Sequence, residues 1–142
     1  MIKKLLTLSV SSLLLFSLGG CGNATSAGKV QQDIKKAEVN KEIKNIASKA
    51  DFTQINNNKQ KLKGEVYYIE GVIDFIDESN KDLPMFTVNT EEQNICGVYD
   101  VINFQEIEVK KGDKIKVYGK VSEEKSELGA PKITGNVIEK LN

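Results

Sequence analysis

The sequence predicts a mainly β protein in which a small five-stranded barrel follows a short helix and a flexible tether. Between residues 61 and 142, apolar and polar residues alternate in five stretches that polar, turn-forming residues separate. This alternation is typical of strands with one buried face. Before it, Ile43, Ile46, Ala47 and Ala50 recur at helical spacing, which indicates a short helix with one apolar face.

The first twenty residues predict an export signal. Lys3 and Lys4 give a positive start, and residues 5–18 form an apolar stretch. That stretch is shorter than the about 20 residues that a membrane-spanning helix needs. The small residues Gly19 and Gly20 then precede Cys21, which fits a signal that a peptidase removes.

The stretch Leu18-Gly19-Gly20-Cys21 resembles the lipobox of bacterial lipoproteins. The resemblance implies that the thiol of Cys21 receives a diacylglycerol, that residues 1–20 are removed, and that acyl chains such as palmitate anchor the new N-terminus. Two acyl chains hold a protein stably at a membrane. We therefore expect a lipid-anchored protein at the extracytoplasmic side of the cell membrane. An ordinary secretory signal that contains a cysteine is the alternative.

Residues 21–39 are expected to be a flexible tether, because they begin with small and polar residues. The domain then spans residues 40–142. It starts with a helical lead-in for which Asn40 is a candidate N-cap, and we expect Phe52 and Ile55 to dock this helix on the barrel. Three asparagines at residues 56–58 predict a turn. A charged, disordered tether is the alternative, more so before Asn40 than after it.

Five strands are expected, at residues 64–76, 85–89, 95–101, 114–121 and 131–138. Gly71, in the middle of the first, predicts a sharp bend or a close approach of another backbone. Tyr67, Ile69, Ile73 and Phe75 fall on one face of that strand. Residues 102–111 are ambiguous, and a single helical turn is one interpretation.

The strand order, with its longer break between the third and fourth strands, matches an OB-fold barrel. The glycine-centred first strand and residues 95–98, 111–121 and 131–133 are similar to the tRNA-anticodon-binding-like OB family. The resemblance covers residues 40–142, and its motifs are turns and core positions. It implies the fold, and members of the family recur in bacterial surface lipoproteins. It assigns no ligand residue.

Composition narrows the chemistry. All 20 basic residues are lysines, and the chain has neither arginine nor histidine nor tryptophan. Arginine favours phosphate and base recognition, and histidine favours zinc and acid–base sites. Without residues 1–20 the chain holds 18 lysines and 20 acidic residues, a net charge of −2. We therefore predict no catalytic residue, no cofactor and no metal; calcium at Asp74, Asp77, Glu78 and Asp82 is the alternative to the last.

Cysteine usage predicts a fold without a disulfide. With Cys21 lipidated, only Cys96 remains, so no internal disulfide can form. Cys96 lies in an apolar strand, and we expect it to pack as a small buried side chain.

A possible ligand face combines aromatic and basic residues: Tyr67, Tyr68, Tyr99, Lys116, Tyr118 and Lys120. Lysines interleaved with aromatic side chains are typical of proteins that follow single-stranded nucleic acid. Residues 61–142, however, hold 11 lysines and 16 acidic residues, a net charge of −5. Such a charge repels phosphate and disfavours nucleic acid as a partner.

The sequence therefore predicts a non-enzymatic binding module for a protein, a peptide or a cell-wall ligand, anchored to the membrane through Cys21. A single-stranded nucleic-acid-binding OB domain is one alternative. A glycan hydrolase working with carboxylates alone is another. Adhesion, immunity or exclusion, and envelope maintenance stay open as the surface role.

Overall fold

The computed structural model of the protein describes residues 24–92, 94–127 and 129–141. The predicted signal at residues 1–20 and Cys21, the predicted lipidation site, lie outside the described residues. No helix within the described ranges is long and apolar enough to cross a membrane.

Five strands form a closed barrel, which confirms the predicted fold class. They are β2 (Val66–Asp77), β3 (Met85–Glu92), β4 (Ile95–Asn103), β5 (Lys114–Lys125) and β6 (Pro131–Lys140). The strand order is β2-β3-β4-β6-β5, and a β2–β5 pairing closes it. β4 and β6 run parallel, whereas the β2–β3, β3–β4, β5–β6 and β2–β5 pairs are antiparallel. This is the five-stranded Greek-key order of an OB fold.

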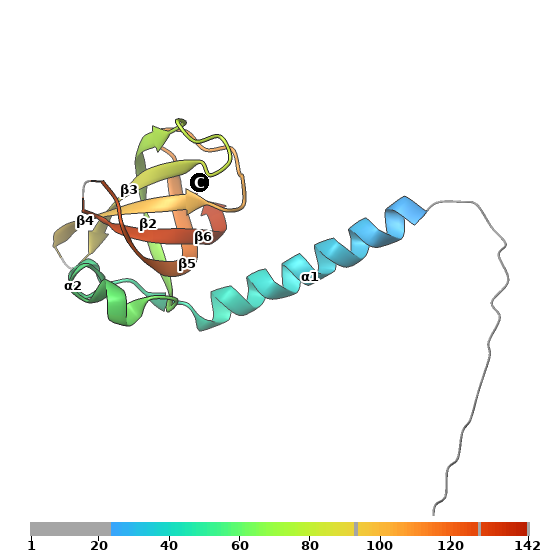
Figure 1. Ribbon diagram of the computed structural model, residues 1–142, viewed down its shortest axis with the longest axis horizontal. Helices are drawn as coiled ribbons and strands as arrows, with labels where there is room; N and C mark the ends of the chain where they lie inside the picture. Colours follow the sequence, from blue (N-terminus) through green and yellow to red (C-terminus); the bar gives the residue numbers. More distant parts are fainter. Residues whose placement is uncertain (1–23, 93, 128, 142) are drawn as a thin grey trace, which may run out of the picture.

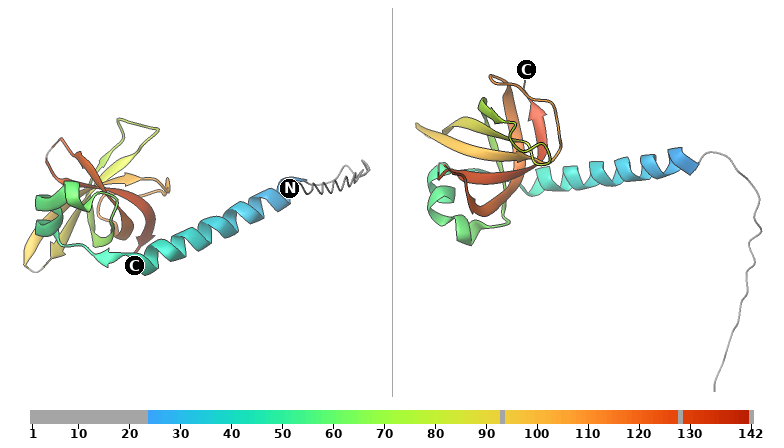
Figure 2. Two further views of the ribbon diagram at one scale, coloured as in Figure 1. Left: turned by 60° about the horizontal axis from the view of Figure 1, so that its bottom comes forward. Right: turned by 45° about the horizontal axis from the view of Figure 1, so that its top comes forward.

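Two helices and a short strand precede the barrel. α1 (Ala24–Ile46) points away from it in every view, whereas α2 (Phe52–Leu62) lies against one end (Figures 1 and 2). Between them, β1 (Ser48–Lys49) pairs in parallel with Tyr67 and Tyr68 of β2. At its C-terminal end α1 reaches the barrel through an ion pair between Lys44 and Glu139 of β6.

The predicted helix boundaries are wrong in two places. α1 continues through Asn40, so Asn40 is not an N-cap, because a helix that already runs through the residue leaves no end to cap. The N-cap that the structure has is Asp51, whose Oδ1 accepts a hydrogen bond from the Gln54 N–H at 2.8 Å. Residues 56–58 belong to α2 rather than to a turn, although Asn58 has non-helical backbone angles. The division of the chain at residues 20 and 39 stays a prediction.

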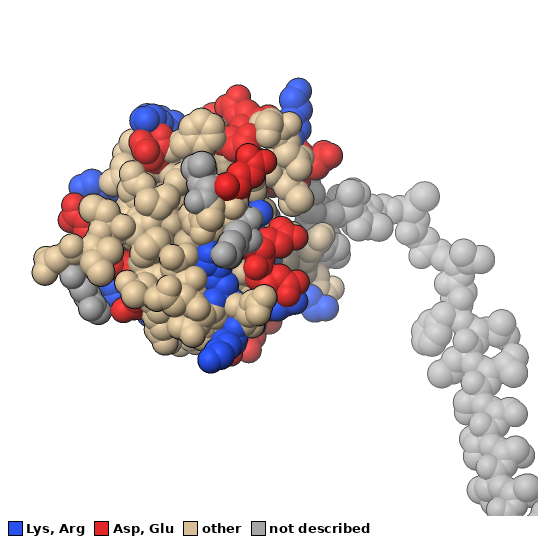
Figure 3. Space-filling model, turned by 60° about the vertical axis from the view of Figure 1, so that its left-hand side comes forward, with Lys and Arg blue, Asp and Glu red and all other residues tan. Residues whose placement is uncertain are grey.

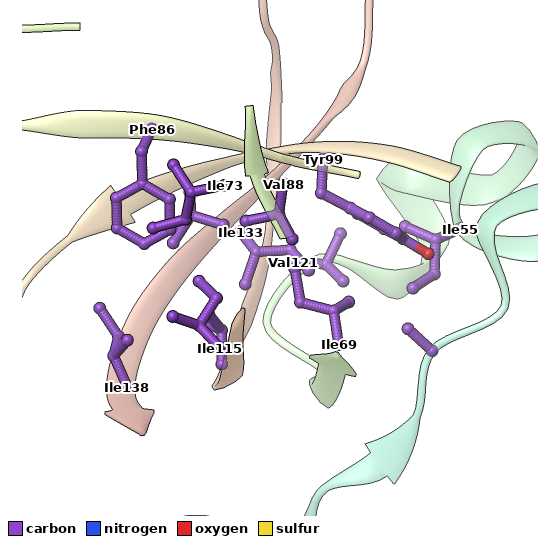
Figure 4. Packing of buried hydrophobic residues seen from close by; sticks show 13 residues of the cluster. Ile55, Ile69, Ile73, Phe86, Val88, Tyr99, Ile115, Val121, Ile133 and Ile138 are labelled. Atoms are coloured by element: carbon purple, nitrogen blue, oxygen red, sulfur yellow. The ribbon is translucent and has the colours of Figure 1, made fainter. Parts of the chain in front are cut away.

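α2 closes one end of the barrel, as expected for Phe52 and Ile55. Ile55 is 0 % exposed and belongs to the core, and Phe52 packs against it. Figure 4 shows Ile55 entering the core from α2 beside Tyr99 of β4. The remaining core side chains are Ala50, which lies between β1 and α2, and residues of all five strands: Ile69, Ile73, Phe86, Val88, Val101, Ile115, Val117, Val121, Ile133 and Ile138.

The opposite end is covered by residues 104–113, which follow β4 and form no helix. The side chain of Asn103 organises this segment: its Nδ2 donates to the Ile107 carbonyl at 2.8 Å and its Oδ1 accepts from the Ile107 N–H at 3.3 Å. Ile107 and Val109 pack against the core. The helical turn considered at residues 102–111 is therefore wrong, because this side chain bonds the backbone locally instead.

The prediction that Phe75 shares the inward face of β2 is wrong, because β2 contains a bulge. The β2–β3 register shifts between Ile73 and Phe75, so Asp74 is an extra residue in β2. An extra residue reverses the alternation beyond it. As a result Phe75 is 61 % exposed, and Ile76 packs against the core in its place.

Gly71 makes the close approach that its position predicts. A Cβ placed on it would lie 2.2 Å from the Asn89 carbonyl oxygen of β3. Only a residue without a side chain brings the two strands this close together.

Candidate functional site

A hollow of about 580 Å³ opens on the outer surface where β1, β2 and β3 meet. It is lined by residues 49–50, by residues 68–72 of β2 and by residues 89–92 of β3; Cys96, Lys114 and Leu141 complete its wall. Its volume lies in the range of ligand pockets, about 300–1,000 Å³. We call this feature the hollow.

The hollow forms where β3 separates from β2. The β2–β3 ladder ends at the Gly71–Thr90 pair, whereas the β3–β4 ladder continues to the Glu92–Ile95 pair. β1 pairs with the same edge of β2 farther along, at Tyr67 and Tyr68. The hollow therefore lies where β2 changes partner from β1 to β3.

Side chains from three rows of the sheet face the hollow. In the first row, Lys114, Val72 and Asn89 are cross-strand partners. Two residues along, Glu70 lies beside Lys116, and Glu91 is the next outward residue of β3.

The third row places Lys49 of β1 opposite Tyr68. The hollow therefore combines lysines, acids, one aromatic ring and the partly exposed Val72.

Charges of both signs meet there, and several of them lack an ion-pair partner among the described residues. Among the described residues, Lys49, Lys114 and Glu91 have no ion-pair partner within 4.0 Å, and the Lys116 Nζ lies 3.8 Å from a carboxylate oxygen of Glu70. Figure 3 shows lysine and acidic side chains intermixed over one face of the barrel. The hollow offers separate positive and negative contacts rather than a field of one sign.

One buried carboxylate fixes the wall of the hollow. Glu92 is 8 % exposed, and its oxygens accept from the Phe52 N–H at 2.6 Å, the Thr90 hydroxyl at 2.8 Å and the Tyr99 hydroxyl at 3.3 Å. The first of these lies at the N-terminus of α2, where the helix dipole favours a negative group. Burial, with the Glu92 charge second, raises the pKa of Tyr99 far above its ordinary value. Glu92 thus joins α2, β3 and β4.

Part of the predicted ligand face does come together. Tyr68 of β2 and Tyr118 of β5 lie with ring centroids 5.8 Å apart, and the Lys116 Nζ lies 4.3 Å from the Tyr68 centroid and 5.6 Å from that of Tyr118. Lys120 is exposed farther along β5, and the Lys44 Nζ lies 5.8 Å from the Tyr118 ring. We call Tyr68, Lys116, Tyr118 and Lys120 the lysine–tyrosine face.

Three side chains lie elsewhere than predicted. Tyr99 is 0 % exposed and Tyr67 packs against the core, so neither belongs to this face. Cys96 is exposed instead of buried, because β4 begins with two exposed residues before its alternation reaches the core.

The acidic residues considered for calcium do not gather. No group of three or more possible metal ligands occurs in the parts of the chain that the structure describes. Asp74 pairs with Lys111 at 3.0 Å. Asp77 accepts from the Ser79 N–H at 2.9 Å, and its hydrogen bonds to Ser79 lower the pKa of its carboxyl. Of these carboxylates, that of Asp77 stabilises the turn after β2.

Most residues that line the hollow could not be identified from the sequence. Gly71 marks the approach of β2 and β3, but nothing in the sequence tells where the two strands separate. Lys49 enters only because β1 folds back on β2. The sequence alone predicts Lys49 to be a solvent-exposed residue of a helix.

No protein-family model matches the chain, and no curated protein is similar to it in sequence. Among solved structures, the solution NMR structure of the second OB-fold domain of replication protein A from Methanococcus maripaludis is similar, at 20 % sequence identity and a TM-score of 0.36. The match covers 56 % of this chain and 85 % of that one. The resemblance to the tRNA-anticodon-binding-like family holds at the level of the OB fold, which rests on the strand order and closure described above.

Proposed function

We propose that the barrel is a non-enzymatic binding module, that a lipid on Cys21 holds it at the outer face of the cell membrane, and that the hollow is its ligand site. The observation that carries this proposal is the hollow itself, a concave surface with polar and apolar walls. OB folds bind ligands on the face of their second and third strands. Here those strands are β3 and β4, and Asn89, Glu91 and Cys96 bring them into the hollow.

The charge on this face argues for a ligand other than nucleic acid. On this face β3 and β4 carry the acids Glu91 and Asp100 and no lysine. Phosphate contacts supply most of the affinity for nucleic acid. A protein, a peptide or a cell-wall fragment fits the hollow better.

A carboxylate-based glycan hydrolase receives less support. Such an enzyme keeps one carboxyl protonated by raising its pKa. The pKa values of Asp77 and Asp113 are lowered, in the latter case chiefly by a hydrogen bond to Lys140. Neither of these two carboxyls has the raised pKa that such an acid needs.

The anchor is tested on the full chain in cells. The change Cys21→Ala should release the protein from the membrane fraction, because the acyl chains that are proposed to anchor it would have no thiol to attach to. Cys96→Ala is the matched control, since it also removes a thiol but should leave fractionation unchanged. A Cys21→Ala protein that stays in the membrane fraction would exclude the lipid anchor.

The ligand site is tested with the chain from residue 22 onwards, which keeps every described residue. Incubated with envelope preparations, it should retain protein or wall fragments, and Val72→Glu should abolish retention. Val72 lines the hollow and is 38 % exposed. Leu83→Glu, at another exposed apolar residue, is the control. Equal retention by the Val72→Glu protein would place the site elsewhere.

Single-stranded nucleic acid is the second candidate, and the lysine–tyrosine face is the observation that favours it. Bases would stack on Tyr68 and Tyr118, while lysines would contact phosphates. Lys116 already lies over both rings and would have to move. Fluorescence anisotropy with labelled oligo-dT and oligo-U, at low and at physiological salt, decides the matter. Salt-dependent binding that Tyr118→Ala abolishes would establish this function in place of the first.

A further inference from the structure

We infer that the hollow binds an extended peptide in which an acidic, a basic and a second acidic residue alternate with small apolar residues. The inference rests on the proposed function and names its ligand class. It follows from the spacing and sign of the charges along the hollow.

The three rows of the hollow have alternating sign. Lys114 stands in the first row, the acids Glu70 and Glu91 in the second, and Lys49 in the third. Successive rows lie two residues apart along a strand, which is about 7 Å. Side chains of an extended peptide that face the same way are also two residues and about 7 Å apart. A peptide lying along β2 therefore presents every second side chain to one row.

The available charges fix the order of residues in that peptide. A carboxylate of the ligand suits Lys114, an ammonium or guanidinium group suits Glu91, and a second carboxylate suits Lys49. None of these three has an ion-pair partner within 4.0 Å among the described residues. The order is symmetric, so both chain directions satisfy it.

Backbone and apolar groups of the hollow support an extended ligand. Ile69 and Glu70 lie on the β2 edge between its pairing with β1 and its pairing with β3, and both line the hollow. Extended peptides bind to such strand edges through main-chain hydrogen bonds. Val72 and Leu141 offer apolar contacts beside them.

A sugar fits the same surface less well. Sugar rings stack on exposed aromatic faces, and Tyr68 is the aromatic residue that lines the hollow. Lys116 lies over its ring at 4.3 Å. A peptide uses charges and strand edges and does not need that ring.

The test uses two synthetic peptides with blocked ends and identical composition. In the first, the order is Ala-Asp-Val-Lys-Val-Asp-Ala; in the second, the same residues are arranged Asp-Asp-Ala-Val-Val-Ala-Lys. The protein is the chain from residue 22 onwards, in which Cys96 is the single cysteine. Because Cys96 is exposed and lines the hollow, its alkylation rate reports occupancy there. The alternating peptide should slow alkylation and bind at least about fivefold more tightly than the rearranged one.

Charge reversal tests the order of contacts. Glu91→Lys should weaken binding of the alternating peptide by about three- to tenfold, as expected when a partly exposed attraction becomes a repulsion. The same variant should prefer a peptide with an acid at the middle position, Ala-Asp-Val-Asp-Val-Asp-Ala, because the central carboxylate then faces a lysine. Lys81→Glu, in the loop between β2 and β3, is the control and should have no effect.

The outcomes separate the inference from the proposed function. If both peptides bind equally, if neither protects Cys96, or if Glu91→Lys changes nothing, the inference is overturned. If envelope material still binds and Val72→Glu abolishes that binding, the proposed function stands even though the peptide inference fails. If the Val72→Glu protein also retains as much material as the wild type, both fail.

Discussion

Glu92 should stabilise the junction of α2 with the barrel more than its exposed neighbour Glu91 does. Its carboxylate is 8 % exposed and accepts three hydrogen bonds, from the Phe52 N–H, the Thr90 hydroxyl and the Tyr99 hydroxyl. A hydrogen bond to a charged group contributes about 1.5–3 kcal/mol, and buried donors left unpaired add a cost. Because the three bonds share one group and are not additive, we expect Glu92→Ala to lower the free energy of unfolding by about 2–4 kcal/mol.

Urea denaturation followed by far-UV circular dichroism measures this change. Glu92→Gln keeps the shape of the side chain and one acceptor oxygen, so this variant should lower the free energy of unfolding by only about 1–2 kcal/mol. Glu91→Ala, at the exposed neighbour, should stay within about 0.5 kcal/mol of the wild type. The reasoning is refuted if Glu92→Ala is as stable as the wild type, or if Glu91→Ala costs as much.

Three further predictions follow from burial and close contacts. Gly71→Ala should destabilise the fold by at least about 2 kcal/mol in urea, because the added Cβ meets the Asn89 carbonyl oxygen; unchanged stability would contradict the close approach. The pKa of Tyr99 is raised above 10.0 in the folded state. The contribution of this hydroxyl to the free energy of unfolding is therefore fully present below pH 10 and is lost as the pH rises above 10. The free energy of unfolding should fall less steeply there for Tyr99→Phe, and equal slopes would exclude this cause. Cys96 should be alkylated in the folded protein almost as fast as in the urea-unfolded chain, since it is exposed; marked protection in the free protein would show that it is buried.

The barrel could be predicted because its signals are local. Alternation with a period of two marks every strand, and the turns between strands carry polar residues. Gly71 announces a close backbone approach for the same reason, since only glycine permits one. Ile55 could be placed in the core because it is apolar at a helical position facing the domain.

The errors come from features that only tertiary structure decides. The bulge after Ile73 shifts the alternation of inward and outward side chains along β2 by one residue, so Phe75 points outward. Asn40 has the residue type of a cap, but α1 already runs through it. Cys96 has apolar neighbours, but its end of β4 extends past the core. The departures at Phe75 and Cys96 move a side chain without changing the strand that carries it.

The candidate site could be predicted only in part. Tyr68, Lys116 and Tyr118 meet because they alternate outward on paired strands. Tyr99 sits on an inward position of β4, and its aromatic character alone did not reveal that. The hollow depends on the separation of β3 from β2 and on the return of Lys49, which are contacts between distant segments.

Cross-linking from Cys96 tests the central claim most directly. A benzophenone attached to this single thiol, on the chain from residue 22 onwards, lies in the wall of the hollow. Irradiated with envelope preparations, it should form a defined adduct that mass spectrometry identifies, and Val72→Glu should abolish it. The same label at residue 81, introduced by Lys81→Cys together with Cys96→Ser, should give no such adduct. An adduct equally strong from residue 81, or none from Cys96, would contradict a ligand site in the hollow.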